Sequence, residues 1–71
     1  MRKRKQIKYI HESKYVAEVD VELMVAEHEW APYLSLEDAY KLDDVREALR
    51  RGDLMAASKK ARVFTLQPVA I

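Results

Sequence analysis

Alternation of apolar and polar side chains over residues 15–25 constrains the fold of this chain more than any other feature. All odd-numbered positions of this segment are apolar, and acids occupy three of the even-numbered positions between them. A period of two over this length is typical of a half-buried β-strand. A shorter alternating run covers residues 6–11, and the polar sequence His11-Glu12-Ser13-Lys14 separates the two runs. The pattern therefore predicts an N-terminal β-hairpin.

The charges of the two runs suggest how they pair. If Lys8 faces Glu18, basic side chains of the first strand lie opposite acidic side chains of the second on the solvated side. Ile7 then meets Val19 on the dry side. A register shifted by two residues is the alternative, and it pairs the charges less well. A shift by one residue would bring apolar side chains opposite acids, so we expect the sheet to avoid it.

Two helices are predicted after the hairpin. The first begins after Ser35, whose hydroxyl can accept from the first-turn amides, and ends before Gly52. Leu42, Val45 and Leu49 share one side of this helix and are predicted to face the core. The second helix is shorter, starts after a capping aspartate at position 53 and runs to position 61.

The final strand is predicted over Val63–Leu66, because Pro68 cannot donate a hydrogen bond to a sheet. We therefore expect one α+β domain over residues 1–71, with residues 1–5 forming a loose basic terminus. The N-terminal hairpin plus the C-terminal strand would make a small antiparallel sheet covered by the two helices, in the order β-β-α-α-β.

The residue types offer little for catalysis or for a cofactor. The 71 residues include no Cys, two His and one Gly, which excludes disulfides, thiolate metal sites and glycine-rich phosphate loops. Asp43 and Asp44 are neighbours, and adjacent helical side chains diverge too far to share a proton. We expect no enzymatic activity, no metal and no cofactor.

The length and composition also bear on location and assembly. No apolar run approaches the roughly 18 residues of a membrane span, and the lack of cysteine fits a reducing cytoplasm. A chain this short buries only about 60% of its unfolded surface, and this one lacks disulfides that would compensate. With 49% hydrophobic residues, it is expected to complete its core in a homo-oligomer or against a protein partner.

Two surfaces are candidates for binding. Leu36 and Tyr40 lie four residues apart and off the core-facing side, and Trp30 and Tyr33 of the preceding loop would join them in a protein-binding surface. The alternative is that this loop only folds over them. The second candidate is a basic N-terminal strand that could contact nucleic-acid phosphates, or could simply pair with acids across the hairpin. Its residues are Arg2, Lys3, Arg4, Lys5 and Lys8.

Three stretches of the chain resemble a known group of proteins: Ala17–Leu23 (AEVDVEL), Trp30 with Pro32–Leu42 (PYLSLEDAYKL), and Ala61–Leu66 (ARVFTL). They are similar to short bacterial and archaeal antitoxins of type II toxin–antitoxin pairs, which are encoded beside a small RNase-type toxin. The resemblance implies a prokaryotic protein that binds and blocks a cognate toxin. The leading hypothesis is thus a non-enzymatic protein-binding module, and the alternative is a small nucleic-acid-binding protein that uses the basic N-terminal strand.

Overall fold

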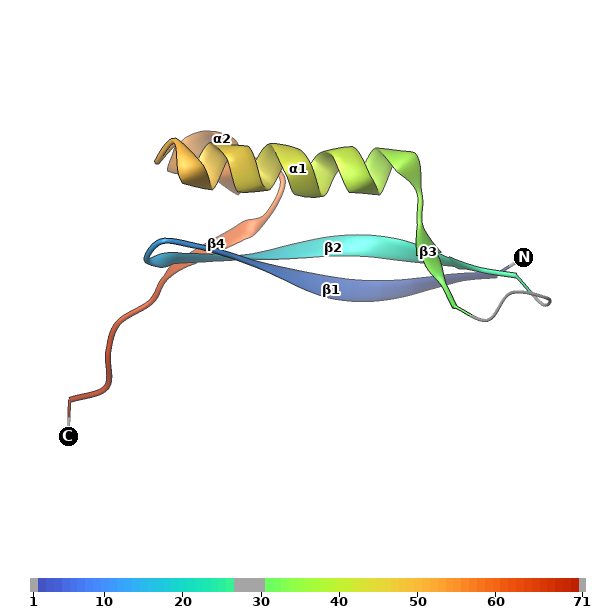
Figure 1. Ribbon diagram of the computed structural model, residues 1–71, viewed down its shortest axis with the longest axis horizontal. Coiled ribbons are helices and arrows are strands. Elements are labelled where there is room, and N and C mark those ends of the chain that lie inside the picture. Colours follow the sequence, from blue (N-terminus) through green and yellow to red (C-terminus); the bar gives the residue numbers. More distant parts are fainter. Residues whose placement is uncertain (1, 27–30, 71) are drawn as a thin grey trace.

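The structure is a computed structural model and describes residues 2–26 and 31–70. It confirms the α+β fold class, with a four-stranded antiparallel sheet and two helices. Both helices lie on the same side of the sheet, and no described element covers its other face (Figure 1). The elements are β1 (Arg2–Glu12), β2 (Tyr15–Val25), β3 (Tyr33–Leu34), α1 (Leu36–Arg50), α2 (Leu54–Ser58) and β4 (Arg62–Thr65).

The hairpin forms, but both predicted registers are wrong. Lys8 lies opposite Val19 and not opposite Glu18, so the pairing is shifted by one residue from the expected one. The turn explains this register. Only Ser13 and Lys14 connect the strands, and Ser13 has a φ of 56°. A positive φ at the first of two turn residues matches the type II′ hairpin turn, which fixes the pairing of the flanking residues.

The shifted register changes which side chains of β1 meet the helices. Ile10 is buried, whereas Ile7 and Tyr9 are 43% and 66% exposed and belong to the opposite face. The expected dry-side contact between Ile7 and Val19 is therefore absent, and Ile7 lies opposite Asp20. An acid opposite an apolar residue is tolerated because this face of the sheet is open to solvent.

Two further details differ from the expectation. Residues 2–5 are not a loose terminus, because they belong to β1 and pair with residues 22–25 of β2. In addition, Tyr33 and Leu34 form the short strand β3, which pairs with β2 on the edge away from β1. The order is thus β-β-β-α-α-β.

The helices begin where the sequence predicts. The Ser35 hydroxyl accepts a hydrogen bond of 3.2 Å from the Asp38 amide, and Gly52 follows α1 with a φ of 75°. Asp53 caps α2 by accepting from the Ala56 amide at 3.1 Å. Unlike the prediction, α2 ends at Ser58.

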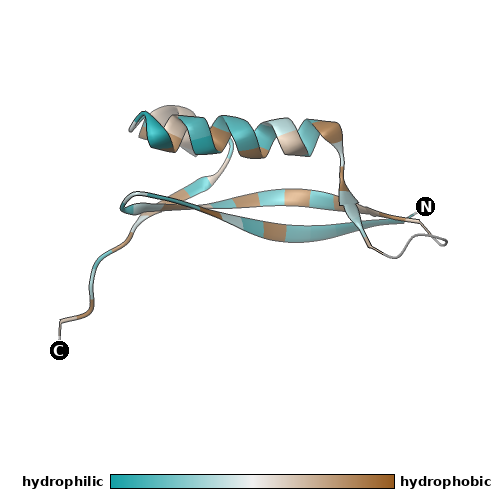
Figure 2. Cartoon of the chain, viewed as in Figure 1, coloured by the Kyte–Doolittle hydropathy of each residue, from teal (hydrophilic) through white to brown (hydrophobic). Residues whose placement is uncertain are grey.

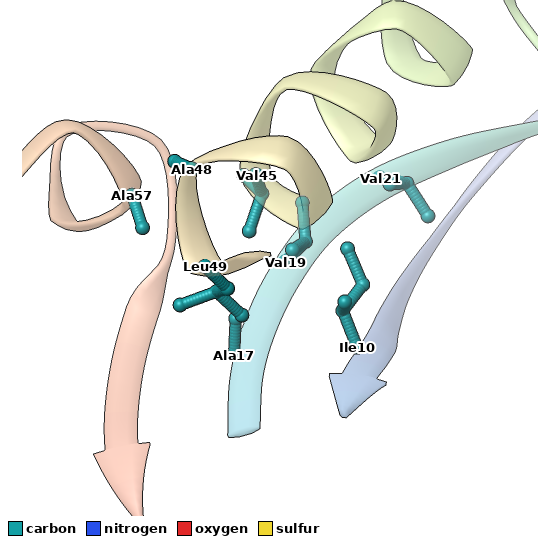
Figure 3. Packing of buried hydrophobic residues seen from close by; sticks show 8 residues of the cluster. All are labelled: Ile10, Ala17, Val19, Val21, Val45, Ala48, Leu49 and Ala57. Atoms are coloured by element: carbon teal, nitrogen blue, oxygen red, sulfur yellow. The ribbon is translucent and has the colours of Figure 1, made fainter. Parts of the chain in front are cut away.

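The core lies between α1, α2 and the neighbouring face of the hairpin, with β2 contributing most of the sheet residues (Figure 3). Apolar and polar bands alternate along β2 (Figure 2), because every second side chain faces the helices. The buried cluster consists of Ile10, Ala17, Val19, Val21, Val45, Ala48, Leu49 and Ala57.

The chain is flat. Its principal extents are 47 × 30 × 14 Å and its radius of gyration is 14.3 Å, against about 11 Å expected for a compact domain of this length. One layer of helices on one sheet is consistent with this shape, and no element of residues 2–26 and 31–70 forms a layer on the second face of the sheet. No helix in residues 2–26 and 31–70 is long and apolar enough to cross a membrane.

Candidate protein-binding surface

The face of the sheet opposite the helices carries an unexpected group of apolar side chains. The odd-numbered core residues of β2 face the helices, so its even-numbered residues point to this open face. Val16 lies there with Phe64 opposite it on β4, and Ile7 and Tyr9 lie on the same face of β1, opposite Asp20 and Glu18 of β2. Val16 is half-buried and Phe64 is 50% exposed. We call these four residues, Ile7, Tyr9, Val16 and Phe64, the open-face patch.

An ionic cluster lies on the open face next to Ile7 and Tyr9 and separates them from β4. The Arg62 guanidinium donates two hydrogen bonds to the Asp20 carboxylate, at 2.9 and 3.0 Å, and a third to Glu18 at 3.1 Å. The hydrogen bond from Arg62 holds the pKa of Asp20 below its ordinary value of 3.8, and the same bond raises the pKa of Arg62. A two-pronged arginine–carboxylate contact has defined geometry. It therefore links β4 to β2 and helps to position Phe64, which lies two residues after Arg62 on the same strand.

The edge of β2 between β4 and β3 is closed by side chains of α1. Residues 19–22 pair with neither of these strands. The Asp38 carboxylate accepts from the Glu22 amide at 2.7 Å, and the Lys41 ammonium donates to the Asp20 carbonyl at 2.8 Å. A hollow of about 780 Å³ adjoins these bonds and is lined by both α1 side chains. Because the Asp38 and Lys41 side chains already bond the backbone of β2, we assign this pair a structural role.

The predicted aromatic surface is divided between two faces. Leu36 and Tyr40 are 67% and 59% exposed on α1, away from its buried side, as the helical pattern predicts. Tyr33 precedes Leu34, which packs against the core, so alternation along β3 directs Tyr33 toward the open face. Trp30 lies outside the described residues. The structure therefore groups Leu36 with Tyr40 but does not bring Tyr33 to them.

The predicted basic residues all lie on β1, the end strand of the sheet, where alternation distributes them over both faces. Lys3 and Lys5 share the open face with the patch. The other three, Arg2, Arg4 and Lys8, share the parity of buried Ile10 and so belong to the helix side. They form a basic strand edge and not a single-faced patch.

Sequence reasoning missed the open-face patch, although one signal pointed toward it. The segment Val63–Leu66 has apolar residues at both odd- and even-numbered positions, which is expected of a strand that makes apolar contacts on both of its faces. The structure places Val63 against the core and Phe64 on the open face. The contribution of β1 depends on the hairpin register, which the charge pattern predicted wrongly.

Within residues 2–26 and 31–70, no group of three or more His, Cys, Asp or Glu side chains is placed to hold a metal ion. The distinctive chemistry of the described surface is instead its exposed aromatic and aliphatic groups, together with the basic edge of β1. Compared with known proteins, the chain matches no family model, no curated protein and no solved structure.

Proposed function

We propose that this protein is a non-enzymatic protein-binding module, an antitoxin that binds and neutralises a small RNase-type toxin in the cytoplasm of a prokaryotic cell. The observation that carries the binding function is the open-face patch on a sheet face with no second layer. Apolar side chains gathered on one exposed face, with charged groups beside them, are typical of protein-interaction sites. The choice of a toxin as the partner is supported by the sequence resemblance to antitoxins.

The patch suits a macromolecular partner better than a small ligand. Its side chains come from three strands and lie on a strand surface, whereas small-ligand sites are concave pockets with converging polar groups. Aromatic residues such as Tyr9 and Phe64 are frequent anchors of binding energy in protein interfaces. The pair Arg62–Asp20 lies among these side chains, and its two hydrogen bonds would continue to satisfy both charged groups under a partner.

A second contact on α1 is part of the proposal. Leu36 and Tyr40 are the large apolar residues that α1 exposes, and they lie on the helix layer. A partner that reaches both faces would enclose the end of this thin domain. Leu36 with Tyr40 and the open-face patch can be tested separately, because substitutions in one leave the other intact.

The experiment uses the protein encoded by the adjacent gene as the candidate toxin. The two proteins are co-expressed, the complex is isolated, and its affinity is measured by calorimetry alongside RNA cleavage by the candidate toxin. We expect stoichiometric inhibition of cleavage, and about tenfold weaker binding for Phe64→Ser. The matched control is Met55→Ser, because Met55 is 80% exposed on α2 and outside both contacts.

Three results would count against the proposal. If no complex forms, the protein encoded by the adjacent gene is not the partner. If a complex forms but RNA cleavage is unchanged, the protein does not neutralise the toxin. If Phe64→Ser binds as tightly as Met55→Ser, the open-face patch is not the contact. Thermal melts of both variants exclude a folding defect as the cause of weaker binding.

A further inference from the structure

The outer edge of β1 has unpaired backbone groups along its length. In the described part of the chain, β1 pairs with β2 alone. The two-residue turn makes Glu12 and Tyr15 a hydrogen-bonded pair, and such pairs recur at every second residue of an antiparallel ladder. Even-numbered residues of β1 therefore bond to β2. The odd-numbered residues from Lys3 to His11 direct their N–H and C=O groups outward.

The opposite edge of the hairpin follows the same rule but is protected. Asp20 and Glu22 direct backbone groups away from β1, and two of these groups are bonded: the Asp20 carbonyl accepts from Lys41 and the Glu22 amide donates to Asp38. The described residues of α1 supply no corresponding bond to the backbone of β1. Side chains of the chain itself thus bond part of one unpaired edge, whereas the 11-residue edge of β1 remains for another strand.

The charge of β1 decides which strand could pair there. β1 carries five basic residues and one acid, Glu12. A second copy of β1 would place like charges next to one another, which disfavours pairing between copies. An acidic strand would instead be attracted on both faces, because basic side chains of β1 point to both. The added strand would lie beside Ile7 and Tyr9 and would widen the open face of the sheet.

We propose that β1 accepts an extended acidic segment of a partner protein as an additional strand of the sheet. In this mode, main-chain hydrogen bonds supply affinity and the alternating side chains supply specificity. The inference deepens the proposed function, on which it rests, because it states which kind of segment the partner presents. The basic residues then select an acidic strand, in addition to keeping two copies of β1 apart.

The test uses a capped ten-residue peptide of alternating glutamate and threonine, titrated onto the full chain. Two control peptides separate the requirement for negative charge from the requirement for an extended strand. A peptide of alternating lysine and threonine reverses the charge. A peptide of alternating glutamate and proline keeps the charge but cannot donate the hydrogen bonds of a strand. We expect the glutamate–threonine peptide to bind at least tenfold more tightly than either control. A ten-nucleotide oligothymidylate is titrated in parallel.

Amide hydrogen exchange, followed by NMR, gives a readout that charge attraction alone would not produce. Addition of a strand should slow exchange at Lys5, Ile7 and Tyr9, whose amides point outward. Exchange at Gln6 and Lys8 should change little, because these amides already bond to β2. The double variant Lys3→Gln/Arg4→Gln should weaken peptide binding at least fivefold. The matched double variant Arg46→Gln/Lys59→Gln loses the same charge from the helix layer and should not.

Each other outcome overturns the inference. Equal binding of the glutamate–proline peptide, or uniform protection along β1, would show charge attraction without strand addition. Tighter binding of the oligothymidylate would identify a nucleic-acid site. No binding would mean that the basic residues only shield the edge. If a candidate toxin binds the Lys3→Gln/Arg4→Gln variant as tightly as the unchanged protein, this inference is contradicted and the proposed function stands. If the peptide protects alternate amides of β1 but no toxin binds, strand addition stands and the proposed function is contradicted.

Discussion

Replacement of Leu49 by alanine tests the packing of α1 on the sheet. Leu49 is 2% exposed and lies in the cluster with Ala17 and Val19 (Figure 3). Truncation of a buried leucine costs about 2–5 kcal/mol, from lost burial and from the cavity left behind. A domain of this size has a free energy of unfolding of roughly 4–10 kcal/mol. A loss of about 3 kcal/mol would lower Tm by about 12–24 °C.

Leu36→Ala is the matched control for this prediction. It makes the same chemical change in the same helix, but Leu36 is 67% exposed, so the cost should stay below about 0.5 kcal/mol. Urea unfolding, followed by circular dichroism, gives the free energy of unfolding of each variant when the two variants have equal m-values. Equal destabilisation by the two substitutions would refute the assignment of the buried side of α1.

Three further outcomes are expected. Because the Arg62 hydrogen bond lowers the pKa of folded Asp20 below 3.8, the ionised carboxylate stabilises the fold above that pH and the contribution is lost as the pH falls through the lowered value. Asp20→Asn should therefore show a shallower loss of stability on acidification in urea titrations. Light scattering at micromolar concentration should give a dimer or larger assembly, because a chain this short without disulfides is expected to complete its core against another chain. Tyr40→Ala should weaken partner binding by more than about 1 kcal/mol in calorimetry, while costing less stability than Leu42→Ala, because Leu42 packs against the core.

The features that sequence predicted well depend on neighbouring residues. Ser35 and Gly52 delimit α1 through contacts within a few positions, and the helical period separates the core-facing Val45 from the exposed Tyr40. The alternation over residues 15–25 identified β2 for the same reason. Local signals of this kind are sufficient because the residues that form a helix cap or one face of a helix or strand lie within a few positions of one another in the sequence.

The features that sequence missed depend on the turn and on pairing between distant segments. Residues 6–11 are apolar at Ile7, Tyr9 and Ile10, so their pattern is compatible with either face. The turn at Ser13 decided the face, through a positive φ that serine rarely adopts. β3 has two residues and no pattern of its own, and the open-face patch joins three strands through their register.

The hairpin turn therefore determines both proposed surfaces. With the register that the charges favoured, Ile7 and Tyr9 would have joined the core, and Lys8 would have met Glu18 on the solvated face. The observed register instead gives β1 one core residue, Ile10, and exposes its other apolar side chains on the open face. It also decides that Lys3 and Lys5 are the basic residues on the open face. The proposed contacts with a partner would give a role to a strand that contributes one core residue yet pairs over 11 residues.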